Sequence, residues 1–397
     1  MDRSILEGDP HSVIEGMLAA AIAVGAKHGF MYIRDEYSLA LNHVAAALDA
    51  ARAAGYLGKR ILGSEFSFDI EIVRGGGAFV CGEETALLQS IEGKVGEPRC
   101  RPPYPSVQGL WGWPTVTNNV ETLANVPVIL ERGGAAFAQV GTATSKGTKV
   151  FAVVGKVQRT GLVEVPMGIT LRDLIDEIGG GVKGGRPLKA VQTGGPSGGC
   201  IPASMLDVSV DYETLTQYGA MMGSGGMIVM DDTSCMVEVA RYYVNFLCEE
   251  SCGKCVPCRE GLRQMLELLT GICEGRGQEG DVELLEALGA TLQDTAFCAL
   301  GRTAANPVLT TIRYFRDEYD AHIREKRCPA GVCKALTAFS IDAGRCVGCG
   351  ACARSCPAEA IHGAVKLPHA VDEATCIACG NCREVCKFDA VYLVRRT

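Results

Sequence analysis

Eight cysteines near the C-terminus repeat one spacing twice. Cys346, Cys349, Cys352 and Cys356 form the run C-x2-C-x2-C-x3-C, followed by Pro357. The second copy, thirty residues later, consists of Cys376, Cys379, Cys382 and Cys386. In such paired runs each fourth cysteine binds the cluster of the other run. We therefore expect one 4Fe–4S cluster on Cys346, Cys349, Cys352 and Cys386, and another on Cys376, Cys379, Cys382 and Cys356.

Two zinc ribbons or a set of disulfides are the alternative interpretation of this repeat. Zinc sites rarely use three cysteines that are each separated by two residues, so iron–sulfur ligation is favoured. Iron–sulfur clusters carry single electrons. The repeat therefore predicts that the chain is part of an electron-transfer pathway.

A third group of cysteines has the same chemistry. Cys252, Cys255 and Cys258 lie in the segment ESCGKCVPCREG, and Cys298 follows in FCALG. Three cysteines at this spacing with one distant cysteine predict a third 4Fe–4S cluster, although the spacing alone leaves zinc open. Predicted helices over 237–247 and 259–270 place the three close cysteines at a helix N-terminus. Backbone N–H groups and the helix dipole stabilise anionic sulfur there.

A glycine-rich turn further upstream has the position of a nucleotide site. A predicted strand over 71–80 contains Gly75, Gly76 and Gly77 and leads into Cys81-Gly82-Glu83-Glu84-Thr85, where a helix over 83–91 begins. Ligands of α/β sheets bind at the carboxyl ends of strands and at helix N-termini. Two glutamates would repel phosphate, but they suit ribose hydroxyls or the edge of a flavin. Alternatively, Glu83 and Glu84 only stabilise the positive end of the helix.

Composition and charge exclude several classes of function. The 397 residues carry 38 Lys and Arg and 46 Asp and Glu, a net charge of −8, so nothing favours nucleic-acid binding. No apolar run reaches the length of a membrane span, and the N-terminus does not resemble a signal peptide. Twenty cysteines without a signal peptide indicate metal ligation in the reducing cytoplasm.

Hydrophobic periodicity predicts several structural layers around these sites. Helices over 11–28 and 38–54, the latter with Ser38 as N-cap, flank a strand over 30–33, which indicates an α/β domain. Residues 148–233 predict a small α+β domain with short strands and a helix over 170–178. Residues 234–325 predict a helical region.

Four segments together resemble a known family. They are residues 75–105, residues 109–124, ESCGKCVPCREG and FCALG. They resemble the flavin-bearing, NADH-binding subunit of respiratory complex I. With the C-terminal cysteine repeat, the chain is more similar to the diaphorase (beta) subunit of soluble NAD(P)-linked iron-only hydrogenases and formate dehydrogenases, several of which bifurcate electrons at the flavin.

The resemblance implies an α/β plus α+β multidomain fold. It implies a partial Rossmann-like FMN and NADH domain over 1–145 and a ubiquitin-like (SLBB) domain over 146–233. A helical bundle with a 4Fe–4S cluster follows over 234–325, and a two-cluster ferredoxin-like domain over 326–397. The family carries its FMN phosphate loop upstream of the point where this chain begins. We therefore expect either a truncated N-terminus or a second polypeptide that completes the flavin site.

The resemblance also implies cofactor contacts and partners. FMN would contact Gly82, Glu83, Glu84, Asn118, Asn119 and Thr122. NAD(H) or NADP(H) would be held by Glu84, Arg101 and Tyr104, with Glu84 as the catalytic residue at which hydride reaches the flavin. The implied partners are a thioredoxin-like 2Fe–2S subunit, a catalytic iron–sulfur subunit and ferredoxin.

A zinc site is a further hypothesis. Cys328 and Cys333 could form a Cys3His site with Cys273 and His369, or they could be reduced cysteines in a linker. The other cysteines, Cys235 among them, lack ligand spacing and are expected to be buried as small apolar residues. No histidine, including His322, lies in a catalytic motif.

These observations predict an NAD(P)H-linked flavin–iron–sulfur subunit of a cytoplasmic complex. An electron-relay scaffold with a non-functional flavin domain is one alternative, and a subunit of complex I itself is the other. Bound flavin distinguishes the first alternative from the leading hypothesis. Neither hydride transfer nor electron transfer at a flavin needs a protein nucleophile, because the cofactor supplies that chemistry.

Overall fold

The first region of the chain is built on two parallel strands. In the computed structural model, which describes residues 1–396, β1 (His28–Arg34) pairs in parallel with β2 (Asp69–Gly75), and His28 lies opposite Asp69. The helices of this region are α1 (Asp2–Gly8), α2 (Pro10–Val24), α3 (Ser38–Ala53), α4 (Glu84–Ile91), α5 (Val120–Arg132) and α6 (Gly134–Phe137). Apolar residues of α1, α2 and α3 bury the strands in one core, against which the start of α5 packs.

Local sequence signals explain where α2 begins and how closely it approaches α5. Asp9 caps α2, because its side chain accepts a hydrogen bond from Ser12 N at 3.2 Å, and Pro10 opens the helix. A Cβ atom at Gly16 would lie 2.0 Å from the Leu123 carbonyl oxygen. Glycine at this position is therefore required for α2 to lie directly against α5.

The segment after β2 leaves its own sheet and packs into the helical region. It forms a short 3-10 turn (Phe79–Gly82) and then α4. Val80, Cys81 and Ala86 belong to the same buried core as the helices of residues 236–323. The predicted nucleotide segment is thus anchored on the helices that carry the third cysteine group.

A mixed five-stranded sheet forms the second region. The strand order is β4-β3-β7-β5-β6, with β3 and β7 parallel and the other neighbouring pairs antiparallel. The strands are β3 (Thr148–Gly155), β4 (Gly161–Pro166), β5 (Leu188–Thr193), β6 (Gly199–Pro202) and β7 (Gly226–Asp231). A π-helix over Asp173–Ile178 and α7 (Tyr212–Gln217) complete its core.

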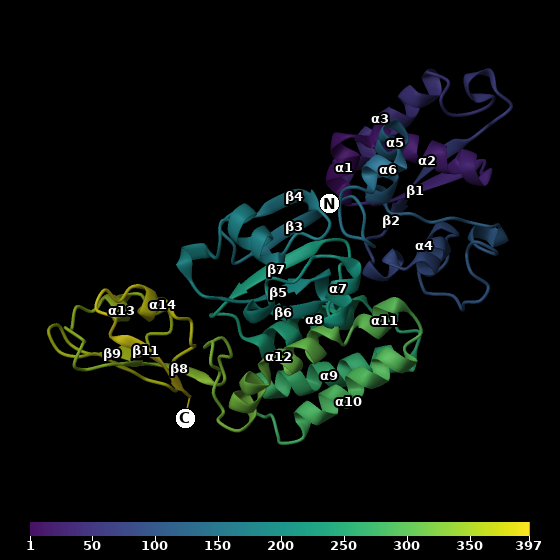
Figure 1. Ribbon diagram of the computed structural model, residues 1–397. Helices are drawn as coiled ribbons and strands as arrows, with labels where there is room; N and C mark the ends of the chain where they lie inside the picture. Colours follow the sequence, from purple (N-terminus) through teal and green to yellow (C-terminus); the bar gives the residue numbers. More distant parts are fainter. Residues whose placement is uncertain (397) are drawn as a thin grey trace.

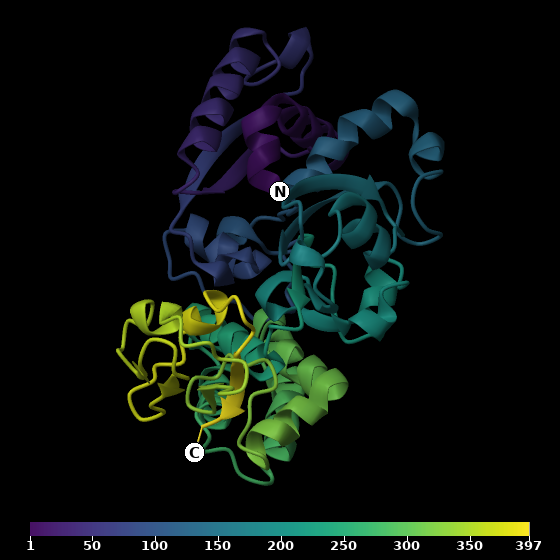
Figure 2. The same cartoon turned by 90° about the vertical axis from the view of Figure 1, so that its left-hand side faces the viewer.

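The third region is helical, and the last region is a small lobe at one end of the molecule (Figure 1). In Figure 2 this lobe lies in front of the helices. The helices are α8 (Met236–Glu250), α9 (Val256–Cys273), α10 (Asp281–Thr295), α11 (Ala299–Thr303) and α12 (Asn306–Ile323). The lobe contains β8 (Thr337–Ile341), α13 (Ala351–Arg354), β9 (Ile361–His362), β10 (Ala370–Val371), α14 (Asn381–Glu384) and β11 (Val391–Arg395). Antiparallel pairing of β8 with β11 joins its two ends.

Several predicted elements differ from the structure in detail. Tyr37, not Ser38, is the N-cap of α3, and its side chain makes no capping hydrogen bond. The strand predicted over 71–80 ends at Gly75, because the glycines that follow leave the sheet. The helix predicted over 170–178 is a π-helix over Asp173–Ile178. In the described part of the chain, no helix combines the length and hydrophobicity that a membrane crossing requires.

Candidate functional site

The structure gives the two adjacent glutamates different roles. Glu83 is the N-cap of α4, and its Oε2 accepts hydrogen bonds from Ala86 N at 2.9 Å and from Thr85 Oγ1 at 2.5 Å. The helix-stabilising interpretation therefore holds for this residue. Glu84 points instead toward other parts of the chain. Its Oε1 accepts from Arg101 Nη1 at 2.5 Å and its Oε2 from Thr117 Oγ1 at 3.2 Å.

These contacts bring three separate segments of the predicted nucleotide site together. Arg101 lies on the long loop after α4, and its Nη2 is also 3.7 Å from Glu83 Oε1. Thr117 directly precedes Asn118 and Asn119, so the start of α5 lies beside Glu84. Asn119 caps α5 by accepting from Glu121 N at 2.9 Å.

The remaining predicted contact residues are accessible to a ligand. Tyr104 is 56% exposed, and Asn118 and Thr122 are exposed at the start of α5. A Cβ atom at Gly82 would meet no neighbouring atom within 4 Å, so its backbone faces open space. The residues present here therefore fit one side of a flavin and nucleotide site, with Glu84 and Arg101 as its charged groups.

An ion-pair network around the buried Glu92 carboxylate, which the sequence did not reveal, holds the loop of Arg101. The Glu92 side chain is 3% exposed, pairs with Lys94 at 2.8 Å and with Arg99, and accepts from Trp111 N at 2.9 Å. Burial alone would raise the pKa of Glu92, but the hydrogen bonds from Arg99, Lys94 and Trp111 outweigh it and bring the pKa to about 2. These contacts fasten both ends of the loop to the end of α4.

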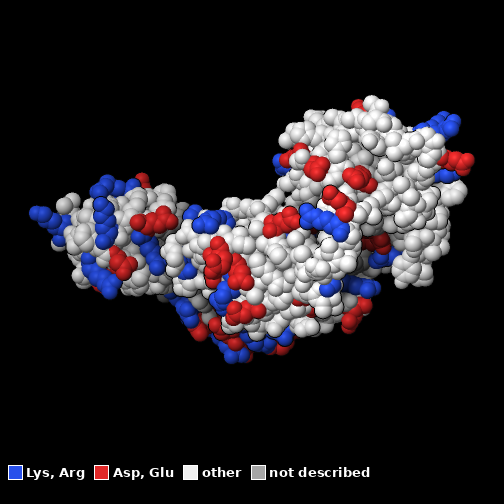
Figure 3. Space-filling view, turned by 45° about the horizontal axis from the view of Figure 1, so that its top comes forward, with Lys and Arg blue, Asp and Glu red and all other residues white. Residues whose placement is uncertain are grey.

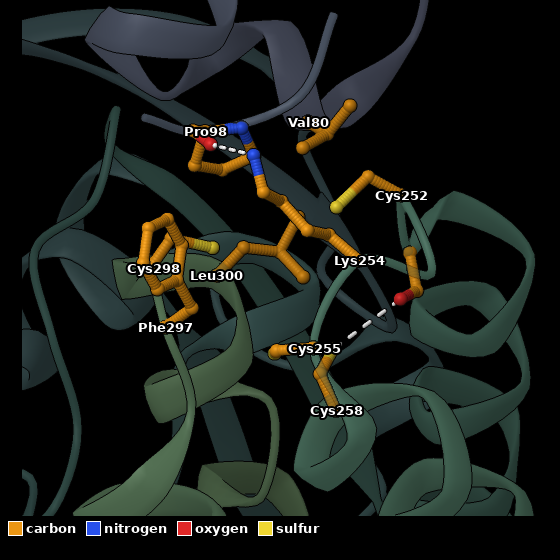
Figure 4. Close-up of a pocket in the computed structure, with 10 residues that line it drawn as sticks. Val80, Pro98, Cys252, Lys254, Cys255, Cys258, Phe297, Cys298 and Leu300 are labelled. Atoms are coloured by element: carbon orange, nitrogen blue, oxygen red, sulfur yellow. Dashed lines mark hydrogen bonds between the residues drawn. The ribbon is translucent and has the colours of Figure 1, made fainter. Parts of the chain in front are cut away.

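The third cysteine group converges on one cavity between the helical region and the nucleotide segment (Figure 4). The cavity is lined by Val80, Pro98, Ser251, Cys252, Lys254, Cys255, Cys258, Phe297, Cys298 and Leu300. Cys255 is the N-cap of α9 and Cys298 is the N-cap of α11. The structure thus brings the four predicted ligands together, and their binding of a 4Fe–4S cluster remains a prediction.

The chemistry of these thiols fits a metal cluster. Burial raises the pKa of the Cys258 thiol to about 11, although a hydrogen bond from Ser251 acts in the opposite direction. Burial also raises the pKa of Cys298, against the effect of the Gly301 and Leu300 N–H groups. Such thiols stay protonated at neutral pH unless bound iron or another cation stabilises their thiolates.

Direct contacts join the nucleotide segment to the wall of this cavity. Phe79 N donates a hydrogen bond to Glu250 Oε2 at 2.8 Å, and the Phe79 ring meets Phe246 edge-on with centroids 5.4 Å apart. Val80 and Pro98 line the cavity itself. The nucleotide side of the molecule is therefore held directly against the cysteine group.

The C-terminal lobe contains two further cysteine cavities. One is lined by Cys346, Cys349, Cys352, Cys386 and His369, among others. The second is lined by Cys356, Cys376, Cys379 and Cys382, among others. Each cavity thus gathers three cysteines of one run and the fourth cysteine of the other.

The four residues predicted to bind zinc are not the four that the structure groups together. Cys235, His322, Cys328 and Cys333 are all buried, and their ligand atoms lie within 4.8 Å of one another. His369 instead lies in the C-terminal lobe, where its backbone N–H points to Cys346 Sγ at 3.4 Å. Cys273 lies beside Cys333 in an overlapping group with Glu238. Sequence spacing missed Cys235 and His322 because the start of α8 and the end of α12 meet only in the fold.

The geometry of this Cys3His group suits a metal. His322 Nε2 lies 3.4 Å from Cys235 Sγ and 3.3 Å from Cys333 Sγ. His322 Nδ1 lies 2.6 Å from the Glu318 carbonyl oxygen, which fixes Nδ1 as the protonated nitrogen and turns the Nε2 lone pair toward the sulfurs. Hydrogen bonds from Cys235 and Cys333 lower the pKa of Cys328, whereas hydrogen bonding to Cys328 and Cys333 raises the pKa of Cys235.

Comparison with known proteins accounts for this combination of sites. The chain is 53% identical to the NADP-reducing hydrogenase subunit HndC of Solidesulfovibrio fructosivorans over 369 residues, which are 93% of this chain and 75% of that protein. It is 48% identical to NADH-quinone oxidoreductase F 2 of Rhizobium meliloti over 328 residues, or 83% of this chain and 78% of that protein. The chain belongs to the NADH-quinone oxidoreductase F family. The resemblance seen in the sequence is therefore confirmed.

Family models and a solved structure agree with this assignment. The Nuo51 FMN-binding domain matches residues 1–128, the SLBB domain 150–201, the NADH-ubiquinone oxidoreductase-F iron–sulfur binding region 238–322 and the 4Fe-4S dicluster domain 339–393. A crystal structure of an NAD+-reducing NiFe hydrogenase in the H2-reduced state superposes on this member of the F family with a TM-score of 0.74 and 36% identity. The match covers 82% of this chain but only 54% of that one.

Proposed function

We propose that the chain is the NAD(P)H-linked diaphorase subunit of a multisubunit, cytoplasmic hydrogenase or formate dehydrogenase. One observation supports this most directly: Val80 and Pro98, on either side of the predicted nucleotide-binding helix, line the cavity of Cys252, Cys255, Cys258 and Cys298. The site where FMN accepts hydride would therefore lie directly beside the cluster that first receives single electrons. Membership of the NADH-quinone oxidoreductase F family supports the same function.

Different residues of the chain would have different roles in this reaction. FMN, when bound, exchanges two-electron hydride chemistry for one-electron chemistry. Gly82, Asn118, Asn119 and Thr122 would contact it through their exposed backbone and side chains. Glu84 would orient the nicotinamide nucleotide and act as the catalytic residue, while Arg101 neutralises its carboxylate at 2.5 Å and Tyr104 offers an exposed ring.

Three cysteine groups would hold three 4Fe–4S clusters, each of which carries one electron when bound. The cavity of Cys252, Cys255, Cys258 and Cys298 lies beside the nucleotide segment, whereas the other two are in the C-terminal lobe. This lobe and α4 lie at opposite ends of the molecule (Figure 1). Electrons would therefore pass between these ends with the help of clusters in partner subunits. We propose a thioredoxin-like 2Fe–2S subunit and a catalytic iron–sulfur subunit as these partners.

We propose a protein electron carrier as a further partner of the C-terminal lobe. Residues 337–396, which form this lobe, contain seven Lys and Arg and six Asp and Glu, so the lobe as a whole has no marked excess of either charge. Basic side chains are nevertheless prominent on the face of the lobe that Figure 3 shows. This face would attract an acidic carrier such as a ferredoxin. A complex that bifurcates electrons would reduce this carrier and NAD(P)+ from one donor only when both acceptors are present.

Zinc is the ion that we propose for the group of Cys235, His322, Cys328 and Cys333. Three thiolates and one imidazole form a closed tetrahedral set of the kind found in structural zinc sites. Elemental analysis of the purified protein should find one zinc per chain, and Cys235→Ser and His322→Ala should lose it while they keep their iron. His369→Ala serves as the control and should keep the zinc. Iron without zinc in the intact protein would exclude the site.

The diaphorase function is tested by the purified chain in complex with its partners. NADH should reduce a small dye acceptor, and Glu84→Gln should lower this activity strongly while iron and flavin contents remain those of the wild type. Glu131→Gln, on the far half of α5, is the matched control and should have no effect. Full activity of Glu84→Gln would contradict the proposed catalytic site.

A further inference from the structure

Lys254 occupies an unusual place in the wall of the cavity beside the nucleotide segment. It lies in the chain between Cys252 and Cys255, two of the four cysteines, and its side chain lines the same cavity (Figure 4). Its Nζ lies 5.6 Å from the centre of the ring of Phe297, the residue directly before Cys298 in the chain. Lys254 thus lies beside the two segments that carry the four cysteines.

The ammonium group of Lys254 donates hydrogen bonds to the loop that follows α4. Nζ donates to Glu97 Oε1 at 2.9 Å and to the Pro98 carbonyl oxygen at 2.8 Å. Both acceptors belong to the loop after α4, four and three residues before Arg101. Lys254 therefore joins the loop of the nucleotide site to the loop of the cysteine group through two hydrogen bonds, one of them between two charged groups.

Other charged groups near the cavity have separate partners. The Glu250 carboxylate accepts from Phe79 N at 2.8 Å, and Arg259 Nη1 donates to the Gly253 carbonyl oxygen at 2.5 Å. Arg302 Nε donates to the Ala296 carbonyl oxygen at 2.9 Å. Lys254 is the cation that lines the cavity itself among the described residues, and Glu97 is the anion paired with it.

We propose that Lys254 is a positioning residue for electron transfer, and that the Lys254–Glu97 pair sets the reduction potential of the cluster on Cys252, Cys255, Cys258 and Cys298. Reduction adds one negative charge to an iron–sulfur cluster, and nearby charges and hydrogen bonds tune its potential. The ammonium of Lys254 favours the reduced form, and the carboxylate of Glu97 opposes it. The proposal rests on the cluster assignment made for the proposed function.

The two members of the pair predict shifts of opposite sign. Lys254→Met keeps the apolar stem but removes the cation and leaves Glu97 unpaired, so the midpoint potential should fall. Glu97→Gln removes the anion and leaves Lys254 charged, so the potential should rise. The side chains are 35% and 34% exposed, so water screens both charges. We expect a threefold to tenfold change in the ratio of reduced to oxidised cluster, equivalent to about 30 to about 60 mV.

The experiment is a mediated redox titration of the holoprotein, followed by the EPR signal of the reduced cluster. Lys254→Arg keeps the charge, and Lys183→Met removes a lysine from the second region; both should have the potential of the wild type. Loss of packing alone would not shift the potential in opposite directions in Lys254→Met and Glu97→Gln. Shifts of the same sign, or no shift in either variant, would overturn the proposal.

Two features keep the outcome decisive. If Lys254→Met fails to bind its full iron content, Glu97→Gln still has to raise the potential, and a Glu97→Gln potential equal to the wild type would overturn the proposal. The titration uses chemical reductant and mediators, not NADH. Its result is therefore independent of whether the chain oxidises nicotinamide nucleotides, so failure of the diaphorase function and failure of the Lys254 proposal can be told apart.

Discussion

Glu92→Gln is the substitution that tests how the loop of Arg101 is held in place. The buried Glu92 side chain pairs with Arg99 and with the exposed Lys94 and accepts from Trp111 N at 2.9 Å, so it ties both ends of residues 92–113 together. Glutamine keeps the shape and one hydrogen-bond acceptor but removes the charge. We expect the loop to open more often and the affinity for the nicotinamide nucleotide to fall.

The magnitude follows from the pKa of Glu92. A decrease from 4.5 to about 2 corresponds, at about 1.4 kcal/mol per unit, to roughly 3 kcal/mol of stabilisation of the charged form. Because the pKa is lowered on folding, this contribution is complete above about pH 4.5 and is lost as the pH falls toward 2. At neutral pH the substitution should therefore cost about 2 kcal/mol, since glutamine retains part of the hydrogen bonding.

Hydrogen exchange of the holoprotein at pH 7 measures this cost locally. A loss of about 2 kcal/mol predicts roughly 30-fold faster exchange in peptides that cover residues 92–113, with the Trp111 amide as the direct reporter. Glu65→Gln, an exposed glutamate of the same region, is the control and should exchange like the wild type. Unchanged exchange of residues 92–113 in Glu92→Gln would refute the reasoning.

Three further predictions concern the separate steps of the reaction. Arg101→Met should raise the KM for NADH about tenfold with little change in kcat, since about 1.4 kcal/mol is expected for a charge-assisted contact, and an unchanged KM would remove Arg101 from the nucleotide site. Cys349→Ala should impair transfer to a protein acceptor but preserve NADH–dye activity, and loss of dye activity with intact folding would show that the electron path is wrong. Raising the salt concentration from about 50 to about 300 mM should lower kcat/KM for an acidic ferredoxin severalfold while the dye reaction stays constant; equal effects on both would argue against a basic docking surface.

The sequence predicted those parts of the site that depend on local spacing. The first three cysteines of each run are separated by two residues, so short turns are enough to bring them together. The fourth cysteine of each run lines the cavity of the other run, which the known pattern of such paired runs predicts. The strand, glycine turn and capped helix around Glu84 are likewise local. The family resemblance, which rests on contiguous segments, was confirmed by the comparisons.

Features that depend on tertiary contacts were out of reach of the sequence. Cys235 lies 87 positions before His322, and the two meet at 3.4 Å only because α8 packs against α12. The role of Lys254 depends on a loop 157 positions upstream. The residues next to Glu92 in the sequence are like those next to many exposed glutamates, and only the tertiary structure buries its side chain. No local pattern indicated that Val80 and Ala86 share a core with the helical region.

The most direct test of the account is an anaerobic titration of the purified protein with NADH, followed by absorbance and EPR, with flavin and iron quantified on the same sample. The account predicts about twelve irons per chain, bound FMN that bleaches on addition of NADH, and signals of reduced clusters that appear afterwards. A protein with its full iron content that binds no flavin, does not respond to NADH and is reduced only by dithionite would contradict it. That result would favour a scaffold that relays electrons between its partners.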